Sequence, residues 1–333
     1  MEGKLVSYSA IPFTPAVSVL MCVFNERAAY LEQAILSILN QTFADFEFVI
    51  LDDGSDRNET IETLEQFAAR DHRVRLFREP RRGLTKSLNI GLSRCRGELV
   101  CRHDSDDWSE PERLARQTEF LKANPEIAIV GSYVRYRQEN GNVLWVVELP
   151  STPHEVKRWL PITSPFAHGA VCFRRNAMAA VGGYREELPC SQDYDCFWRL
   201  CDRFSGTNIP AVLYNYRYTG VSISARRWYD QARVGLAARK LADARRKGEP
   251  EDIQSALQEA DAHFQHIDRN YPALLREMDH IILAGYYRKG LLTGLRGLRS
   301  HPFTIRGWLK LARGVLFWAF PPIRKRLFSS GRV

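Results

Sequence analysis

Residues 46–55 read FEFVILDDGS, an apolar run that ends in two aspartates, a glycine and a serine. Residues 98–107 read ELVCRHDSDD and also place acidic side chains directly after an apolar run. Runs of this kind predict buried strands. Carboxylates at the carboxyl ends of neighbouring parallel strands converge on the crevice where open α/β sheets bind ligands. Because such carboxylates repel one another unless a cation neutralises them, the pattern predicts a nucleotide site in which Mg²⁺ or Mn²⁺ carries a diphosphate.

The segments around these two runs alternate between apolar strand-like runs and periodic helix-like patterns. Strands are predicted at residues 17–24, 46–51, 74–77 and 98–103, and helices at 30–39, 58–70, 84–95 and from Pro111 onward. Strands that alternate with helices predict a mostly parallel, doubly wound α/β sheet flanked by helices.

After Asn124-Pro125 the pattern changes to longer strands, with a hairpin signal at Asn140-Gly141. The elements predicted there are strands at 127–137 and 143–149, a helix at 154–160, a strand at 170–173, a helix at 194–204 and a strand at 211–218. Later residues read as helical, most clearly from 230 to 247. We therefore divide the chain into an extension (1–15), an α/β domain (16–224, with halves 16–124 and 125–224) and a helical basic C-terminal region (225–333).

The net charge of +8 comes from the end of the chain. From His280 to Val333 there are eleven Lys and Arg and no Asp or Glu, whereas residues 1–279 carry 36 basic and 39 acidic groups. This split points to an anionic surface as partner. We expect a cytoplasmic protein, because no signal peptide and no apolar run of ~20 residues is found. Seven cysteines without C-x-x-C pairs indicate reduced thiols rather than disulfides or a zinc site.

Three motifs carry a resemblance to a known family. They are VSVLMCVFNE at residues 17–26, the Asp-Asp-Gly-Ser turn at 52–55, and Asp104-x-Asp-Asp. Their order and spacing resemble those of family 2 glycosyltransferases, over about residues 16–224. The resemblance implies the GT-A fold, a nucleotide-sugar donor and inversion at the anomeric carbon.

The resemblance also implies roles on the donor side. Asp106 would bind the divalent ion that bridges the two phosphates, and Asp53 would read the base or ribose. The residues expected to bind the donor nucleotide are Phe24, Asn25, Glu26, Asp53, Arg82, Lys86, Asp104 and Ser105. Simpler roles stay open for some of these loops: Asn25 and Asp107 are residue types that cap helices, and the basic turn at 81–86 is also compatible with plain solvent exposure.

On the acceptor side, the resemblance assigns the general base to Asp193 in the stretch Ser191-Gln192-Asp193-Tyr194-Asp195. Gln192 stands where the family more often has Glu, so only Asp193 carries over. An inverting transfer needs one carboxylate to accept the proton of the attacking hydroxyl. His168 is expected to face the acceptor. The alternatives are a helix cap for Asp193 and a structural role for His168, and Asp195 is expected to point outward or to form a salt bridge.

Two departures from the family pattern are informative. Tyr218 and Thr219 follow Arg217 where many relatives have a histidine that binds the metal, so we expect the metal to rest on Asp106, phosphates and water. Residues 224–228 read SARRW and lack the Gln of processive synthases. Transfer of one sugar per encounter is therefore expected.

Residues 306–326 combine basic groups, aromatic rings and a short apolar core. This composition suits a helix in the membrane interface, where anionic lipid attracts each nearby cation by ~1 kcal/mol. We expect peripheral contact with the inner face of the cytoplasmic membrane. A helix packed on the catalytic domain, or a dimer contact, is the alternative. No nucleic acid partner is expected, because the rest of the chain is net negative.

Together these features predict an inverting, metal-dependent glycosyltransferase. It would move one sugar from a nucleoside diphosphate, which we expect to be UDP, to a hydroxyl of a saccharide or lipid-linked saccharide in envelope polysaccharide or glycoconjugate synthesis. One alternative is a sugar-phosphate nucleotidylyltransferase, which should have a glycine-rich phosphate loop where this chain has Asn25-Glu26-Arg27. The other is a non-catalytic, membrane-associated protein that binds nucleotide sugars.

Overall fold

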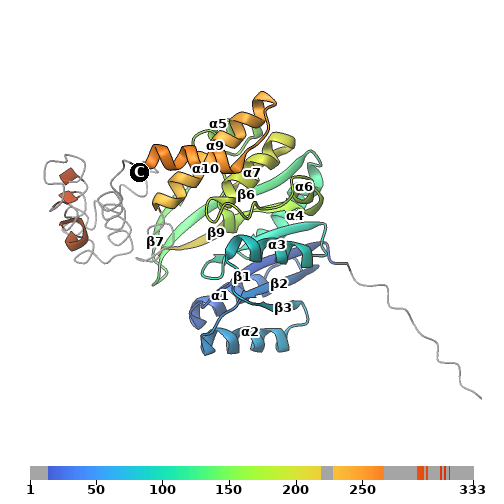
Figure 1. Ribbon diagram of the computed structural model, residues 1–333. Coiled ribbons are helices and arrows are strands. Elements are labelled where there is room, and N and C mark those ends of the chain that lie inside the picture. Colours follow the sequence, from blue (N-terminus) through green and yellow to red (C-terminus); the bar gives the residue numbers. More distant parts are fainter. Residues whose placement is uncertain are drawn as a thin grey trace, which may run out of the picture.

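The computed structural model describes residues 14–218, 228–265, 291–295, 298, 308–309, 311–312 and 315. In this part the chain forms one curled sheet with helices on both faces (Figure 1). The strands are β1 (Val17–Val23), β2 (Phe46–Asp53), β3 (Val74–Glu79), β4 (Leu99–His103), β5 (Trp108–Ser109), β6 (Ile127–Gln138), β7 (Val143–Val147), β8 (Cys172–Arg174) and β9 (Ser205–Tyr218). The helices are α1 (Ala28–Leu39), α2 (Asn58–Arg70), α3 (Leu84–Arg94), α4 (Arg113–Ala123), α5 (Pro153–Trp159), the 3₁₀ turn η1 (His168–Ala170), α6 (Arg175–Ala180), α7 (Gln192–Arg203), α9 (Trp228–Lys247) and α10 (Ile253–Phe264).

The order of strands brings the two acidic motifs to one edge of the sheet. The order is β3-β2-β1-β4-β8-β6-β9-β5, with β7 paired to β6, and β1 runs parallel to both β2 and β4. Val23 pairs with Asp52, and Met21 pairs with His103. The acidic ends of β2 and β4 therefore lie at the same edge, but on either side of β1. At the usual strand spacing they are about 10 Å apart rather than on adjacent strands.

Most predicted elements are found within a few residues of their expected bounds, and the hairpin at Asn140-Gly141 is confirmed by antiparallel pairing of β6 with β7. The strand expected at 170–173 begins only at Cys172, because His168–Ala170 form η1. Two short elements, β5 and α6, were not predicted. β5 has only two residues and exists through its pairing with β9, which no local pattern reveals.

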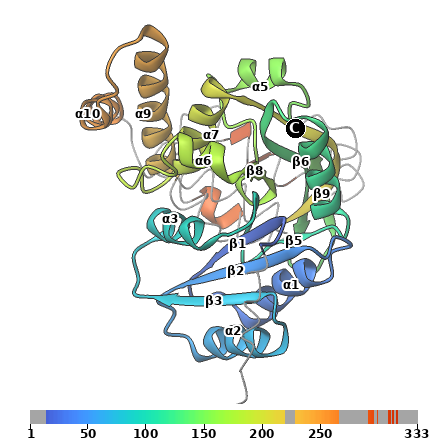
Figure 2. The ribbon, with the colours of Figure 1, turned by 90° about the vertical axis from the view of Figure 1, so that its right-hand side faces the viewer.

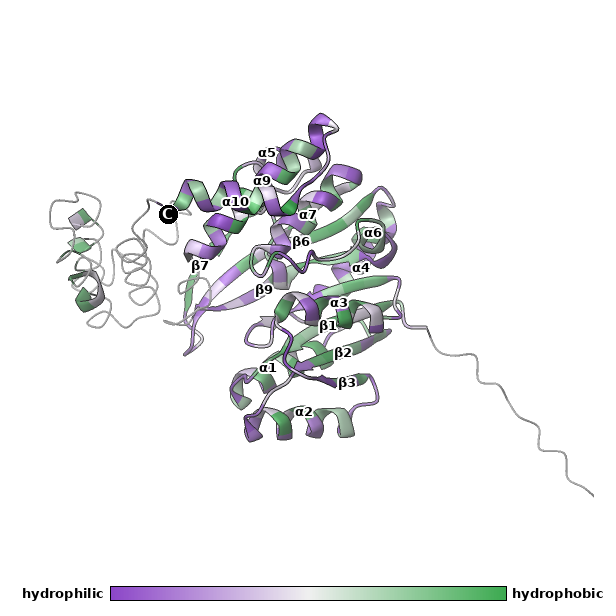
Figure 3. Ribbon diagram, viewed as in Figure 1, coloured by the Kyte–Doolittle hydropathy of each residue, from purple (hydrophilic) through white to green (hydrophobic). Residues whose placement is uncertain are grey.

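The core consists of two apolar layers, one on each face of the sheet. Val19 and Met21 of β1 face the layer covered by α1, α2 and α4, whereas Leu20 and Cys22 face the layer covered by α3, α5, α6 and α7. Figure 2 shows α1 and α2 on the side of the sheet opposite α3. Because both faces are covered, the strands at the centre are mostly apolar, which Figure 3 shows as largely green ribbons.

In the C-terminal region, helix α9 packs onto the half of the α/β domain formed by residues 125–224. Ala238 and Ala242 of α9 join the core layer that contains α7, and α10 packs against α9. Among the residues that the structure describes, no helix is both long and apolar enough to cross a membrane. Residues 1–13 lie outside the described residues. Most of residues 306–326 do so too, and membrane binding by this segment therefore stays a prediction.

One buried carboxylate joins β1, β2 and the loop before β4, and it yields a stability prediction. Glu47 accepts hydrogen bonds from the Ser18 hydroxyl (2.6 Å), the Arg96 N–H (2.7 Å) and the Arg75 guanidinium (2.6 Å). Burial alone would raise the pKa of Glu47, but these donors outweigh burial and lower it. We expect Glu47→Ala to lower the free energy of unfolding by about 3 kcal/mol at pH 7, because it leaves buried donors without an acceptor.

The pH dependence of this loss follows from the lowered pKa. The stabilisation by Glu47 is complete above its unfolded-state pKa near 4.5 and is lost as the pH falls through the lower folded-state pKa. Urea unfolding at pH 7 and pH 3 should therefore show a smaller gap between wild type and variant at pH 3. Glu65→Ala is the control, because Glu65 is an exposed partner of Arg78 and should change stability by less than about 1 kcal/mol. Equal stability of Glu47→Ala and wild type at pH 7 would contradict this account.

Candidate active site

The loop after β1 is tied to the turn after β2. Asn25 has a left-handed backbone (φ 49°), and its side-chain oxygen accepts the N–H groups of Asp56 (3.0 Å) and Arg57 (3.1 Å). Its own N–H donates to the Ser55 hydroxyl (2.9 Å). The helix that follows Asn25 has Arg27 as its N-cap, so the alternative that Asn25 caps it is wrong. Asn25 instead holds the segment that leads into α2.

The two aspartates of the Asp-Asp-Gly-Ser turn have different tasks. Asp52 accepts the Ser55 N–H (3.0 Å) and thereby shapes the turn. The buried Asp53 carboxylate accepts the N–H groups of Arg82 (2.7 Å) and Gly83 (2.9 Å) and the Ser87 hydroxyl (2.7 Å). Asp53 therefore anchors the loop and the first turn of α3. Its predicted contact with the base or ribose stays a prediction.

The basic turn at residues 81–86, before α3, lies beside the loop that follows β1. Gly54 allows the close approach: its φ is +74°, and an added Cβ would lie 2.6 Å from the Arg81 nitrogen. The Arg81 guanidinium carbon lies 3.4 Å from the centre of the Phe24 ring. Arg82 and Lys86, the predicted donor residues, are half exposed, at 3.9 Å from Glu79 and 3.8 Å from Glu186 respectively. Arg81, which the resemblance places beside the diphosphate together with Arg82 and Lys86, thus covers Phe24.

Asp104 is paired with a buried cation that the sequence analysis did not single out. Arg102 is 2% exposed and forms an ion pair with Asp104, while its Nε makes no hydrogen bond within the described part of the chain. The Asp104 N–H donates to the Tyr214 hydroxyl (3.1 Å). An arginine inside an apolar strand and two residues before an aspartate is the sequence signal that could have revealed this pair.

We call residues 104–107, which follow β4, the acidic loop. Besides Asp104, this loop contains the partly exposed carboxylate of Asp106 and the buried carboxylate of Asp107. Burial and the nearby charges of Asp104 and Glu26 raise the pKa of Asp106 to about 7. Asp107 is buried and accepts the Arg217 N–H (2.7 Å). The N-cap of α4 is Glu112, so the alternative that Asp107 caps the next helix is wrong. Ser105, between Asp104 and Asp106, is partly exposed.

These carboxylates suit a hard divalent ion whose remaining coordination positions are filled by a bound diphosphate. In the described residues, no group of three or more His, Cys, Asp or Glu could hold a metal by protein ligands alone. Mg²⁺ is commonly held by one or two carboxylates together with substrate phosphates. Burial and, after it, the negative charges of Asp104 and Glu26 raise the pKa of Asp106, and a cation bound there would offset these charges. The residues present therefore fit a metal that arrives with a diphosphate.

Asp193 is the second residue of α7, at the start of the helix. The N-cap is Ser191, whose backbone is left-handed (φ 52°), so the alternative that Asp193 is the cap is wrong. The Asp193 side chain is partly exposed, and Gln192 beside it is buried. Burial raises the pKa of Asp193, while main-chain N–H groups and the charge of Arg102 oppose the rise. A carboxylate with a raised pKa at the start of a helix is suited to accept a proton.

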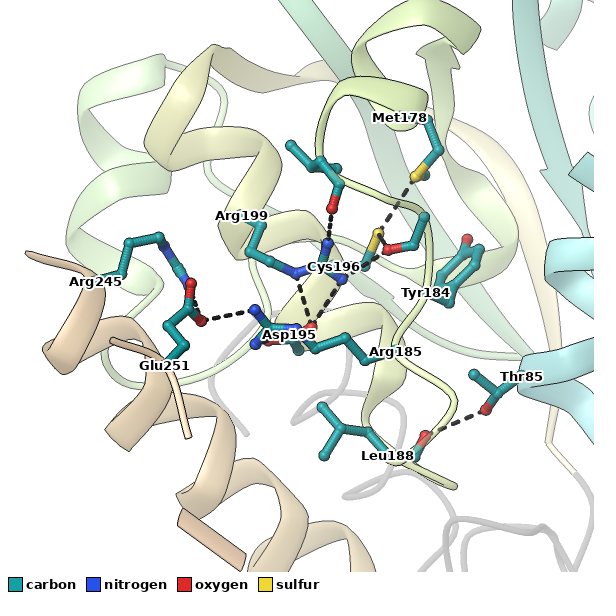
Figure 4. A network of polar contacts seen from close by, with 12 residues as sticks. Thr85, Met178, Tyr184, Arg185, Leu188, Asp195, Cys196, Arg199, Arg245 and Glu251 are labelled. Atoms are coloured by element: carbon teal, nitrogen blue, oxygen red, sulfur yellow. Dashed lines mark hydrogen bonds and ion pairs between the residues drawn. The ribbon is translucent and has the colours of Figure 1, made fainter. Parts of the chain in front are cut away.

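An ion-pair network fixes the start of α7 (Figure 4). Asp195 is buried between Arg185 (3.1 Å) and Arg199 (2.9 Å), and Arg185 continues to Glu251 (2.8 Å) in the segment between α9 and α10. Arg199 also donates to the Gly183 carbonyl (2.7 Å). The expectation of a salt bridge for Asp195 is confirmed, and the expectation that it points outward is wrong. The network holds the loop that precedes Asp193 against the C-terminal helices.

His168 lies in η1, next to the acidic loop. Its Nε2 is 3.0 Å from the Tyr184 hydroxyl, and burial together with the charge of Arg102 lowers the pKa of the imidazole well below 6.5. His168 is therefore neutral at pH 7. The neighbouring Gly169 lies so close that an added Cβ would be 2.4 Å from a carboxylate oxygen of Asp104. The structure thus brings the predicted acceptor-side histidine next to the donor-side loop.

Two cavities in the described part of the chain have linings that can be compared with the predicted site residues. A groove of about 480 Å³ runs along α1 and β5, with Gln33, Leu36 and Trp108 in its lining. A second cavity, of about 220 Å³, lies between α5, α7 and α9 next to Trp198. No residue predicted for the site lines either cavity, so the chemistry of the loops, rather than an enclosed pocket, locates the site.

Comparison with known proteins identifies the family of this chain. The model of a family described as glycosyl transferase family 2 matches residues 18–182. The O-antigen biosynthesis glycosyltransferase WbnJ of Escherichia coli is 31% identical over 225 residues, which are 66% of this chain and 87% of WbnJ. The chain belongs to glycosyltransferase family 2.

This family 2 glycosyltransferase is also similar to the UDP-Gal:alpha-D-GlcNAc-diphosphoundecaprenol beta-1,3-galactosyltransferase of Escherichia coli, at 29% identity over 62% of this chain and 75% of that protein. Among solved structures it resembles the mannosyltransferase PcManGT from Pyrobaculum calidifontis in complex with GDP-Man and Mn²⁺. The TM-score is 0.54 at 20% identity, over 93% of this chain and 89% of the other. This likeness confirms the GT-A fold.

The contact between η1 and the acidic loop of this family 2 glycosyltransferase can be tested with one methyl group. Gly169→Ala would place a Cβ 2.1 Å from the Tyr214 hydroxyl and 2.4 Å from the Asp104 carboxylate. Because both groups are held in place, we expect a loss of about 1–2 kcal/mol in the free energy of unfolding, measured in urea. Gly235→Ala in α9 is the matched control, because no atom lies within 4 Å of its added Cβ. Unchanged stability of Gly169→Ala would show that the two loops are not in contact.

Proposed function

We propose that this enzyme transfers a single sugar, with inversion, from a nucleoside diphosphate to a hydroxyl of a saccharide or lipid-linked saccharide. The observation that carries the proposal is the meeting of two carboxylate sites around Arg102. Asp104 and Asp106 lie on the donor side, and the charges of both Arg102 and Asp104 act on the pKa of Asp193. An inverting transfer requires these two sites: one for the leaving diphosphate and one for the acceptor proton.

On the donor side, Asp106 would hold Mg²⁺ or Mn²⁺ together with the two phosphates. Such an ion supplies Lewis-acid stabilisation of the departing diphosphate. Arg82 and Lys86 are exposed cations next to the loop anchored by Asp53, where they would further stabilise the charge on the leaving group. The Mn²⁺ in the PcManGT complex supports a divalent ion.

On the acceptor side, Asp193 would accept the proton of the attacking hydroxyl as that oxygen bonds to the anomeric carbon. The bond from this carbon to the diphosphate oxygen breaks in the same step, and its electron pair leaves with the nucleoside diphosphate. No covalent bond to the enzyme forms. Neutral His168, held by Tyr184, would orient the acceptor.

The relatives support a role in polysaccharide synthesis, since WbnJ is named for O-antigen biosynthesis. A nucleotidylyltransferase is disfavoured by membership of a glycosyltransferase family and by Asn25-Glu26-Arg27 in place of a glycine-rich phosphate loop. The name of one relative includes UDP-Gal, which supports UDP, whereas PcManGT was solved with GDP-Man. The nucleotide therefore has to be tested directly.

The donor site can be tested by calorimetric titration with UDP, GDP, dTDP and ADP, each with and without Mn²⁺. We expect one diphosphate, UDP, to bind with Mn²⁺, and Asp106→Ala to lose this binding because the metal loses its carboxylate. Glu112→Ala is the control, since it removes an exposed carboxylate that follows the acidic loop. Metal-independent binding, or an Asp106→Ala variant that binds as the wild type does, would refute the metal assignment.

The general base can be tested with Asp193→Asn. We expect kcat to fall by at least about 100-fold while the donor still binds. Because burial raises the pKa of Asp193 above 3.8, wild-type kcat/KM should fall as the pH drops through that raised value, and the variant should lack this limb. Glu187→Gln, an exposed carboxylate in the preceding loop, should keep the wild-type profile. Near-normal transfer by Asp193→Asn would exclude it as the base.

A further inference from the structure

Arg217, at the end of β9, is buried against the back of the acidic loop, and nothing in the transfer mechanism above uses it. Only 3% of the residue is exposed. Its Nε donates to the main-chain carbonyl of Asp106 (2.7 Å), and its main-chain N–H donates to the side chain of Asp107 (2.7 Å). Its Nη2 donates to the side-chain oxygen of Gln33 on α1.

Two aromatic rings complete the environment of this guanidinium. The guanidinium carbon of Arg217 lies 4.0 Å from the ring centre of Tyr30 and 4.8 Å from that of Trp108. Tyr30 belongs to α1, and Trp108 begins β5, directly after the acidic loop. A single residue thus joins α1 and the acidic loop, in the half at residues 16–124, to β9 in the half at residues 125–224.

We propose that Arg217 is a positioning residue that fixes the main chain of Asp106 and Asp107, so that the Asp106 carboxylate is presented to the metal. The loop is already fixed further along, where Trp108 pairs with Asn215. Arg217 contacts the carbonyl of Asp106 rather than its carboxylate, which leaves the carboxylate oxygens available. The metal part of this inference rests on the proposed function, whereas the fixing of the loop does not.

The geometry requires an arginine rather than any cation. Arg217 uses two different nitrogens, Nε and Nη2, for acceptors on separate elements, and its flat group lies against two rings. A lysine ammonium is a single point on a flexible stem and cannot reach both acceptors in this arrangement. Arg217→Lys therefore keeps the charge and removes the bridge, which separates positioning from electrostatics.

The experiment compares Arg217→Lys with Arg135→Lys in the full-length protein. Arg135 on β6 is a matched control, because it pairs with Glu110 (2.6 Å) near β9 and makes no contact with Asp106 or Asp107. Hydrogen exchange of the main-chain amides of residues 104–109 measures how firmly the loop is held. A titration with Mn²⁺ in saturating UDP, monitored through the spectrum of free Mn²⁺, measures the affinity of the site for the metal.

For Arg217→Lys we expect about fivefold faster exchange in residues 104–109, as the loss of one hydrogen bond allows. We also expect about tenfold weaker Mn²⁺ binding, the usual size of an effect on a group that orients a metal ligand. Arg135→Lys should match the wild type in both measurements. Gln33→Leu, which removes the α1 partner of Arg217, should shift both in the same direction by a smaller factor, and it serves as the test if Arg217→Lys does not fold.

The outcomes distinguish this inference from the proposed function. Unchanged exchange at residues 104–109 in Arg217→Lys overturns the inference, whatever the metal does. Faster exchange with unchanged Mn²⁺ affinity overturns the link from the loop to the metal. If the wild type binds no Mn²⁺ with UDP, the proposed donor site fails, and the exchange measurement still decides whether Arg217 fixes the loop.

Discussion

The charged side chain of Arg102 is buried, with only 2% of the residue exposed, and it forms an ion pair with Asp104. A buried cation costs several kcal/mol of desolvation unless a partner compensates it. The acidic loop after β4 has an excess of negative charge, because its carboxylates repel one another. Each therefore stabilises the other. Burial raises the pKa of Asp106 and of Asp193, and the charge of Arg102 opposes both rises; together with burial it keeps His168 neutral.

Other arginines also hold the segments that carry the predicted site carboxylates. Arg217 holds the acidic loop from behind, through main-chain groups, and Arg185 and Arg199 enclose Asp195 one turn into α7. Arg217 thereby fixes the main chain beside the Asp106 carboxylate, and Arg185 and Arg199 hold the start of α7, where Asp193 lies. The site is thus positioned by ion pairs and hydrogen bonds beneath the loops, while the loops themselves remain open to ligands.

Sequence reasoning located the elements and the loops well, because both follow from local pattern. The helix Asn58–Arg70 was predicted to the residue, and the continuous apolar runs of β1, β2 and β4 were recognised as buried strands. What it missed depends on contacts between distant residues. β5 exists only through β9, and η1 replaces the start of a predicted strand. Asp195 has the spacing of an exposed helical residue, yet it is buried because Arg185 reaches it across a loop.

The sequence by itself indicated that carboxylates follow buried strands and that one aspartate begins a helix, and the resemblance of its motifs to family 2 glycosyltransferases predicted the family that the comparisons show. Apolar periodicity and acidic motifs are local properties, so they can be read without coordinates. Only the tertiary structure decided which carboxylates are free. Asp53 and Asp107 are consumed by main-chain N–H groups of other segments, whereas Asp106 and Asp193 remain partly exposed. That choice rests on hydrogen bonds between residues 29 to 110 positions apart, which no local pattern encodes.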